Sequence, residues 1–215
     1  MFEVSENCNS KVKAKRLIKE AEMYQKLRTS FEQYTKLTDE EFDSIKNEMT
    51  LKSFNKGDYF VKSGQLCKHI GFLVNGISRV YYLEDGKEIT SYFNYQDRNP
   101  LVSSFVSFLT NEPSYENIHI IEDAEMLIIS KESLDKLYES SNNIQKLGRL
   151  MAEHNYVLSM ERIYSLQHQS AQQRYELLLK TYPNLLNTIP HHYIASYLGV
   201  TPESMSRIRK SIAGS

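Results

Sequence analysis

The sequence has little of several residue types. Its 215 residues include no Trp, two Cys, five Pro and eight Gly. Two cysteines cannot form a disulfide framework, which favours a reducing compartment. Its apolar stretches are shorter than the roughly 18 residues that a membrane-spanning helix needs. The region where a signal peptide would place an apolar run carries Lys11, Lys13, Lys15 and Arg16. These absences predict a cytoplasmic protein with no membrane segment.

Large apolar side chains are plentiful, with 15 Tyr and 9 Phe, so the chain can bury a core and wholesale disorder is excluded. The net charge of −1 is unevenly distributed: it is +2 over residues 1–35, −7 over residues 36–140 and +4 over residues 141–215. An acidic middle followed by a basic C-terminal part suggests two functions on one chain. Chance fluctuation in charge is the alternative interpretation.

The middle of the chain has the pattern of a β-sandwich or barrel. Residues 11–34 first predict a polar helix, and Thr38 with Glu41 predicts a capping box that opens a second one. From residue 51 to residue 130, short β-rich runs then alternate with turn residues at intervals of roughly 9 to 14 residues. Within this region Asn75-Gly76 predicts a type I′ hairpin turn, and residues 103–110 predict a short helix.

After residue 130 the pattern becomes helical. A short helix is predicted over residues 133–138, and a long one runs from residue 143 to about residue 168, roughly 38 Å. Apolar residues recur along the long helix near heptad spacing, and those expected to form a dimer contact are Ile144, Leu147, Met151, Val157 and Leu158. We expect this helix to pack against its copy in a homodimer. The alternative is the core helix of a monomer.

The C-terminal segment predicts two short helices joined by a tight turn. Ser170 with Gln173 first opens a helix that ends before Pro183. The first helix of the pair covers residues 191–198, and Gly199 can take the positive φ that ends it. Thr201 is the expected N-cap of the second helix. This is the pattern of a DNA-binding helix-turn-helix, and an ordinary helical hairpin with a solvated charged face is the alternative.

The polar face of the second helix has the chemistry of base recognition. Arg207 can donate two hydrogen bonds to guanine, and Glu203 can accept one from cytosine. The residues suited to phosphate contacts, which position a protein without specifying sequence, are Ser196, Thr201, Arg209 and Lys210.

These motifs together resemble the cyclic-AMP receptor/fumarate-nitrate regulator (Crp/Fnr) family of bacterial transcription factors. The resemblance runs from about residue 37 to residue 210, and the most specific stretch is residues 197–210. It implies an α+β protein with an N-terminal β-roll (jelly-roll) sensor domain, a long dimerisation helix and a C-terminal helix-turn-helix domain. It also implies a homodimer on double-stranded DNA, a small-molecule effector of unknown identity, and RNA polymerase as a partner. The corresponding division of the chain is 1–36 (helical extension), 37–140 (β-roll), 141–168 (dimerisation helix) and 169–215 (DNA-binding domain).

The effector pocket departs from the cyclic-AMP binders of the family. The residues that correspond to its ligand-binding region are Ser103, Ser104, Phe105, Ser114 and Tyr115. Residues 99–130 contain no Lys or Arg, although the phosphate of a cyclic nucleotide needs a cationic partner when it is buried. We therefore expect no useful affinity for cyclic nucleotides.

Other functions fit the sequence less well. Two cysteines are too few for the iron–sulfur cluster of the oxygen-sensing branch, and no metal or cofactor site is predicted. A cupin-type enzyme needs clustered His and carboxylate ligands, whereas the β-rich region holds only His69 and His119, so we predict that the chain is not an enzyme. The alternative function is a β-roll module that binds a ligand or a protein and does not bind DNA.

Overall fold

The computed structural model describes residues 3–181 and 185–213. The helices are α1 (Glu3–Glu32), α2 (Asp39–Glu48), α3 (Phe105–Thr110), α4 (Lys131–Ser140), α5 (Asn142–His168), α6 (Ala171–Thr181), α7 (Leu185–Thr188), α8 (His191–Tyr197) and α9 (Pro202–Ala213). The strands are β1 (Thr50–Phe54), β2 (Tyr59–Val61), β3 (His69–Glu84), β4 (Lys87–Tyr95), β5 (Leu101–Val102) and β6 (Asn117–Ser130). Among these residues, no helix combines the length and the apolar character that crossing a bilayer requires.

The strands form one antiparallel β-roll in the order β1-β6-β3-β4, with β2 paired to β6 and β5 paired to β3. The two long strands, β3 and β6, run side by side for most of their length. Side chains that point into the roll fill it, among them Leu73, Val80, Ile118, Ile120 and Met126, all fully buried. The β-rich middle of the sequence is thus confirmed as a single domain-sized roll.

The predicted hairpin at Asn75-Gly76 is wrong, because β3 runs straight through these residues. Gly76 takes φ +88° at an irregularity in the pairing of β3 with β6. A Cβ at this position would lie 2.5 Å from the Asp123 carbonyl oxygen, so only glycine fits. The true hairpin turn is Asp85-Gly86, where both residues have positive φ, as a type I′ turn requires.

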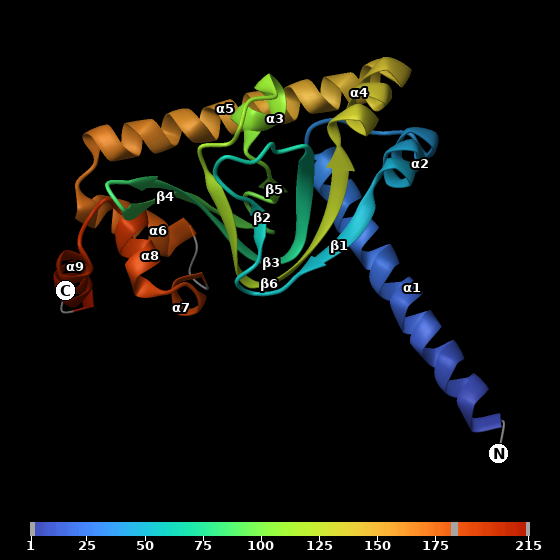
Figure 1. Cartoon of the computed structure of the whole chain (residues 1–215), viewed down its shortest axis with the longest axis horizontal. Coiled ribbons are helices and arrows are strands. Elements are labelled where there is room, and N and C mark those ends of the chain that lie inside the picture. Colours follow the sequence, from blue (N-terminus) through green and yellow to red (C-terminus); the bar gives the residue numbers. More distant parts are fainter. Residues whose placement is uncertain (1–2, 182–184, 214–215) are drawn as a thin grey trace.

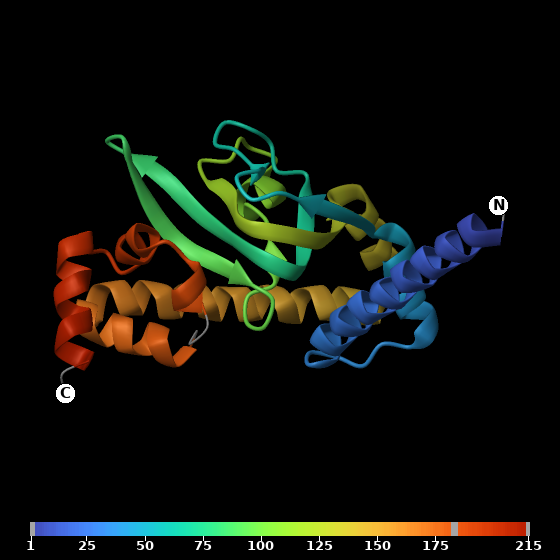
Figure 2. The ribbon, with the colours of Figure 1, turned by 90° about the horizontal axis from the view of Figure 1, so that it is seen from below.

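Helix α5 lies along the β-roll and joins the two ends of the molecule. Figure 1 shows α1, α2 and α4 at one end of α5 and the helices α6–α9 at the other. In Figure 2 the β3–β4 hairpin reaches from the roll toward α6–α9. The N-terminal part of α1 projects away from the body. The predicted fold class is therefore confirmed, and the predicted domain boundaries stay predictions.

The C-terminal part of α1 belongs to the core. Met23, Leu27 and Phe31 are buried in a cluster with residues of β3, β6 and α5, including Phe72 and Leu147. The expected helix over residues 11–34 is confirmed, and it begins earlier, at Glu3.

Local capping fixes several helix starts. The predicted capping box of Thr38 and Glu41 is present in both directions: Thr38 Oγ1 accepts from the Glu41 N–H at 3.2 Å, and the Thr38 N–H donates to Glu41 Oε2 at 2.9 Å. Ser130 and Ser141 cap α4 and α5 in one direction: the Ser130 hydroxyl accepts from the Ser133 N–H, and the Ser141 hydroxyl accepts from the N–H groups of Asn143 and Ile144. The predicted capping pair of Ser170 and Gln173 at the start of α6 is also present, with the Gln173 N–H donating to Ser170 Oγ at 3.2 Å.

Truncating Leu27 tests whether α1 is part of the folded core. The Leu27 side chain is fully buried, so Leu27→Ala should lower the free energy of unfolding by about 2–5 kcal/mol. Ile18 on the same helix is 59% exposed, and Ile18→Ala should change it by no more than about 0.5 kcal/mol. Urea unfolding measures both values, and equal effects would show that α1 does not pack as described.

Candidate functional site

Helices α8 and α9 form the predicted helix-turn-helix. Gly199 takes φ +68°, and the Val200 N–H donates to the Ala195 carbonyl at 3.0 Å, which closes the turn. Thr201 Oγ1 accepts from the Ser204 N–H at 3.3 Å, so the predicted cap of α9 is confirmed.

The inner faces of both helices are buried in one core, which turns the polar side of α9 outward. Ala195 and Leu198 on α8 are fully buried, and Met205 on α9 is 1% exposed. Tyr175 and Leu178 of α6 complete this cluster. The small side chain of Ala195 leaves room for a second helix to cross closely.

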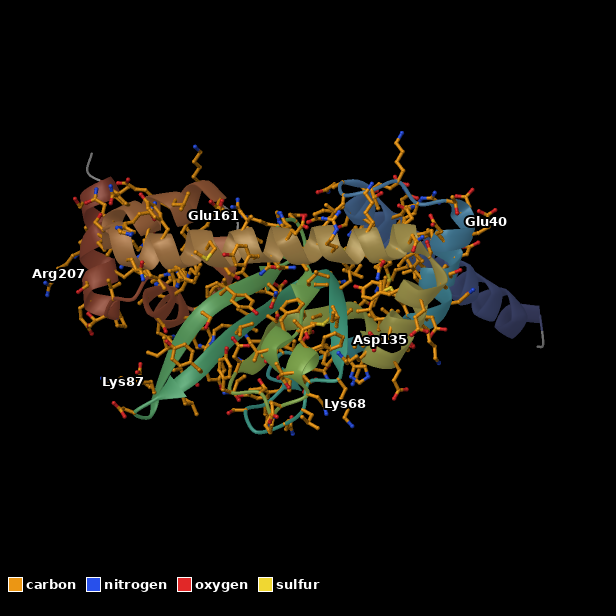
Figure 3. The ribbon with its side chains drawn as sticks, turned by 90° about the horizontal axis from the view of Figure 1, so that it is seen from above. Glu40, Lys68, Lys87, Asp135, Glu161 and Arg207 are labelled. Atoms are coloured by element: carbon orange, nitrogen blue, oxygen red, sulfur yellow. The ribbon has the colours of Figure 1, made fainter. Side chains whose placement is uncertain are left out.

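The outer face of α9 presents Glu203 and Arg207, the predicted base-contacting residues, and both are exposed. Figure 3 shows Arg207 pointing away from the body. The pKa of Glu203 is lowered, first by its own backbone N–H and then by the Thr201 hydroxyl, so the carboxylate stays an acceptor. A guanidinium donor and a carboxylate acceptor four residues apart on one helical face suit the edges of bases in a major groove.

Three of the predicted phosphate-binding residues lie on or next to α9. Lys210 is exposed. Arg209 is also exposed, and its Nη1 lies 3.0 Å from Nε2 of His191 at the start of α8. Thr201 is exposed, and its hydroxyl serves the cap. The structure thus brings these three together around one helix, and their contacts with phosphate stay predictions.

Ser196 is the exception, because it faces the β-roll. Its hydroxyl donates to the Glu88 carbonyl at 2.8 Å and accepts from the Thr90 N–H at 2.9 Å, both on β4. A serine hydroxyl has one proton, and here that proton is already used. This arrangement corrects the assignment of Ser196 to a DNA phosphate.

Side chains of the predicted effector pocket are hydrogen-bonded to one another. Ser104 and Ser114 are buried; the Ser114 hydroxyl donates to Ser104 Oγ at 2.9 Å, and Ser104 Oγ donates to Glu116 Oε2 at 3.2 Å. Tyr115, by contrast, is 57% exposed and lies outside this network. The structure therefore brings two of the predicted residues together around Glu116, which the sequence analysis did not assign to the pocket.

The other two predicted pocket residues stand next to this network. The buried Ser103 donates its hydroxyl to the His69 carbonyl at 3.0 Å and lies 3.4 Å from Cys67 Sγ. Phe105 begins α3 and is half-buried. Both help to close the roll near the start of α3.

Glu116 gives this part of the roll an electrostatic character opposed to phosphate binding. Burial raises the pKa of Glu116, and the hydrogen bond from Ser104 opposes this shift. A phosphate here would meet a carboxylate in place of a cation, at a cost that backbone N–H groups offset only in part.

A cavity of about 410 Å³ lies elsewhere, between α1, α5 and the β-roll. Buried residues of β3 and side chains of α5 contribute apolar surface, including Phe72, Leu73 and Met151. Polar residues such as Lys26 and His154 also line it. Its volume falls within the usual range for small-molecule sites.

The apolar residues of α5 divide between two faces, which corrects the predicted dimer contact. Ile144 and Leu147 are buried in the chain's own core, and Met151 packs against that core. Leu158 lines the cavity beside α1. Of the five predicted residues, Val157 is the exposed one, at 51%. It belongs to an apolar stripe on the opposite face, which we define as Tyr156, Val157, Met160, Ile163 and Tyr164.

Two arginines to which the sequence analysis gave no role tie the helix-turn-helix to α5 and α6. Arg174 donates through Nε and Nη2 to the Leu198 carbonyl at 3.0 and 2.7 Å. Arg162 donates through Nε to the Ser91 carbonyl at 3.1 Å and through Nη2 to the Tyr197 carbonyl. Sequence spacing carries no sign of these contacts, because each one joins residues far apart in the chain.

Comparisons with known proteins agree with this architecture. Residues 51–141 match the cyclic nucleotide-binding domain family. FixK2 from Bradyrhizobium japonicum has a similar structure, with a TM-score of 0.65 and 19% identity over 77% of this chain and 85% of that chain. A structure from Eubacterium rectale, described as a regulator of the Crp/Fnr family, has a TM-score of 0.62 and 21% identity over 82% of this chain and 84% of that chain. The Catabolite Activator Protein of Thermus thermophilus has a TM-score of 0.51 and 21% identity over 84% of this chain and 86% of that chain.

Residues 51–141 are therefore similar in sequence to a cyclic nucleotide-binding domain. The fold of the chain, a β-roll followed by a long helix and C-terminal helices, is similar to the fold of the Crp/Fnr regulator from Eubacterium rectale. This confirms the resemblance inferred from the sequence. No curated protein matches the chain in sequence. The Eubacterium rectale structure is described as a transcriptional regulator and the Thermus thermophilus protein as an activator, which agrees with the prediction that the chain is not an enzyme.

Replacing Glu116 should make the pH dependence of stability visible. Because burial raises the pKa of Glu116, the folded chain binds this proton more tightly than the unfolded chain does. The ionised carboxylate therefore destabilises the fold above the raised pKa, and this penalty disappears as the pH falls to the ordinary value. Glu116→Gln keeps an acceptor for Ser104 and removes the charge. We expect its Tm to exceed that of the unaltered chain near pH 8, and the difference to shrink toward about pH 4.

Thermal unfolding followed by circular dichroism across this pH range measures the effect. The control is Glu112→Gln, which alters an exposed carboxylate in the same region. A lower Tm for Glu116→Gln at every pH, or a difference that does not change with pH, would contradict the electrostatic interpretation.

Proposed function

We propose that the chain is a homodimeric transcription regulator that reads double-stranded DNA through α9. The observation that carries the proposal is the exposed face of α9, which holds Glu203 and Arg207 outward while its inner face is locked in the core. Arg207 serves as a bidentate donor to guanine, and Glu203 accepts from cytosine. Lys210 and Arg209 flank this face and bind phosphates.

The apolar stripe on α5 supports the dimer. Its members range from 44% exposed at Met160 to 66% exposed at Tyr156, although all are large hydrophobic side chains. A contiguous apolar surface of this kind marks a contact with another molecule. Parallel pairing of two copies along α5 covers the stripe and places the two α9 helices at the same end of the dimer, where they can enter successive major grooves.

The sensor role belongs to the β-roll end of the molecule. The network of Ser104, Ser114 and Glu116 supports a roll that does not take cyclic AMP, so any effector differs from a cyclic nucleotide. As a regulator of transcription the protein acts in the cytoplasm. RNA polymerase as a partner stays a prediction that no contact tests.

Selection of bound sites from random DNA tests the function directly. We expect a near-palindromic site whose affinity falls by roughly 10³–10⁵ between 50 and 200 mM salt, because a dimer that makes about 6–10 phosphate contacts releases counterions. On the selected site, Arg207→Ala should relax discrimination at one base pair per half-site by about 1–3 kcal/mol. Lys210→Ala should weaken all sequences alike and reduce the salt dependence.

Fluorescence anisotropy with the selected duplex and its single-base variants measures both effects. Equal losses on every duplex for the two variants would contradict the assignment of Arg207 to a base. Failure to enrich any site, with no salt-dependent binding, would favour a β-roll module that does not bind DNA.

A charge within the α5 stripe should break the dimer. Met160→Glu places a carboxylate where the two copies would exclude water, so we expect a monomer at micromolar concentration. Ser159→Glu adds the same charge at an exposed position of α5 that lies off the stripe, and it should stay dimeric. Size-exclusion chromatography with light scattering distinguishes the two states. A dimeric Met160→Glu variant would place the contact elsewhere.

A further inference from the structure

A fully buried arginine lies where the β3–β4 hairpin meets the first helix of the helix-turn-helix. Arg79 on β3 is 0% exposed, and its guanidinium lies 3.6 Å from the ring centroid of Tyr193 on α8 and 4.1 Å from that of Tyr81. Its Nη2 pairs with Glu88 on β4, while Nε and Nη1 have no hydrogen-bond partner among the described residues. The cation is thus held by one ion pair and by two aromatic faces, one from each side of the joint.

This arrangement makes the burial of Arg79 depend on docking of α8. Tyr81 and Glu88 belong to the hairpin itself, and they accompany Arg79 whether or not α8 is present. Tyr193 comes from the DNA-binding end. A buried charge is costly unless it is paired, and a cation–π contact is strongest when water is excluded. Removal of α8 would open one face of the guanidinium to solvent, so the hairpin and α8 are energetically linked through this side chain.

Further contacts cross the same joint. Ser196 is hydrogen-bonded to the backbone of Glu88 and Thr90, and the rings of Phe93 and Tyr197 lie 5.5 Å apart. Arg162 connects Ser91 on β4 to Tyr197 on α8, and its guanidinium stands 3.8 Å from the Tyr197 ring centroid. Helix α5 therefore takes part in the joint through Arg162. The hairpin, α8 and α5 meet at one place.

The joint leaves the reading face of α9 uncovered. The contacts use α8, whereas Glu203 and Arg207 stay exposed on α9, and Figure 3 shows Arg207 pointing away from the body. Docking is therefore compatible with DNA binding, and its physical effect is to fix the direction of α9 relative to α5. A recognition helix whose direction is already fixed loses less conformational entropy when it binds DNA, which increases affinity.

We propose that the dock, defined as Arg79, Tyr81, Glu88, Tyr193 and Ser196, is the element that orients the DNA-binding end and transmits changes in the β-roll to it. The docked state is the DNA-competent state, and undocking through the hairpin lowers DNA affinity. This inference rests on the proposed function for its effect on DNA. The dock itself is independent of DNA and can be measured without it.

Arg79→Met tests the dock, because Met keeps an unbranched apolar stem and removes the charge and its stacking. The matched control is Lys87→Met, which removes a positive charge from the tip of the same hairpin, where Figure 3 shows the side chain pointing into solvent. Hydrogen–deuterium exchange of the full-length dimer, followed by mass spectrometry, reports on the joint directly. We expect faster exchange over residues 191–197 and in β4 for Arg79→Met, no change in α3, and no change anywhere for Lys87→Met.

DNA affinity for the selected duplex gives the second readout. Arg79→Met should lose affinity by roughly 5- to 150-fold, and Lys87→Met by less than about twofold. Tyr193→Leu should reproduce the loss, and the double variant should lose little more than either single one, because both remove the same contact. If Arg79→Met does not fold, Glu88→Gln removes the ion pair alone and should increase exchange over the same peptides.

Unchanged exchange over residues 191–197 in Arg79→Met would overturn the dock. Faster exchange combined with unchanged or higher DNA affinity would overturn its role in orienting α9. If the unaltered chain binds no DNA, the proposed function fails, and the exchange data still decide whether the dock exists.

Discussion

The structure depends on how helix α5 distributes its apolar residues. A helix of 27 residues spans roughly 40 Å, longer than one face of the β-roll can cover. Its first half is buried by α1, α4 and the roll through Ile144 and Leu147, whereas its second half leaves Val157, Met160 and Tyr164 exposed on the opposite side. The same helix therefore supports the N-terminal extension, the roll, the proposed partner copy and the helix-turn-helix.

Side chains near the two ends of α5 attach other elements of the molecule to this helix. Near the start of α5, Asn143 donates to Glu41 Oε2 at 2.8 Å and to the Lys36 carbonyl at 2.8 Å, which fixes α2 and the preceding loop to it. Near its end, Arg162 holds β4 and α8. Arg79 is buried near this second point. A buried charge contributes little net stability, but it tolerates few alternative arrangements of the surfaces around it, so it favours one arrangement of the joint.

Elements specified by neighbouring residues could be predicted from the sequence. The caps at Thr38 and Thr201 depend on residues three apart, and both were predicted correctly. The turn at Asn75-Gly76 was wrong for the opposite reason: the dipeptide favours a turn, but close approach of β3 to Ala124 decided the outcome. Helical periodicity along α5 identified apolar positions correctly, and it could not say which of two apolar faces meets the chain's own core.

In the functional site, too, residues fixed by near neighbours in the sequence could be predicted, and residues fixed by distant contacts could not. Glu203 and Arg207 were predicted as an exposed pair because the capped helix and its inward apolar residues fix their face locally. The position of Ser196 could not be inferred, because its partners on β4 lie more than a hundred residues away. The burial of Arg79 could not be predicted from the sequence for a further reason. Ser78 and Arg79 are both fully buried although they point to opposite sides of β3, so the alternation expected of a half-exposed strand is absent here.

The hydrogen-bonded network of Ser114, Ser104 and Glu116 inside the roll limits which ligands could send a signal to α9 from there. A ligand phosphate near Ser104 would have to displace the Glu116 carboxylate or lie beside it, and both alternatives place negative charge where burial already raises the pKa of that carboxyl. The cavity between α1 and α5 is lined by cationic side chains such as Lys26 as well as by Asp97, and the part of α5 that lines it is the middle of the helix, from Met151 to Leu158. Because α5 is one continuous helix, a displacement of α5 at the cavity would also move Arg162 relative to β4. That movement would alter the contacts of the dock. The physical requirement for regulation is then modest: two positions of α5 against the roll that differ by a few kcal/mol, one of which keeps Tyr193 stacked on Arg79.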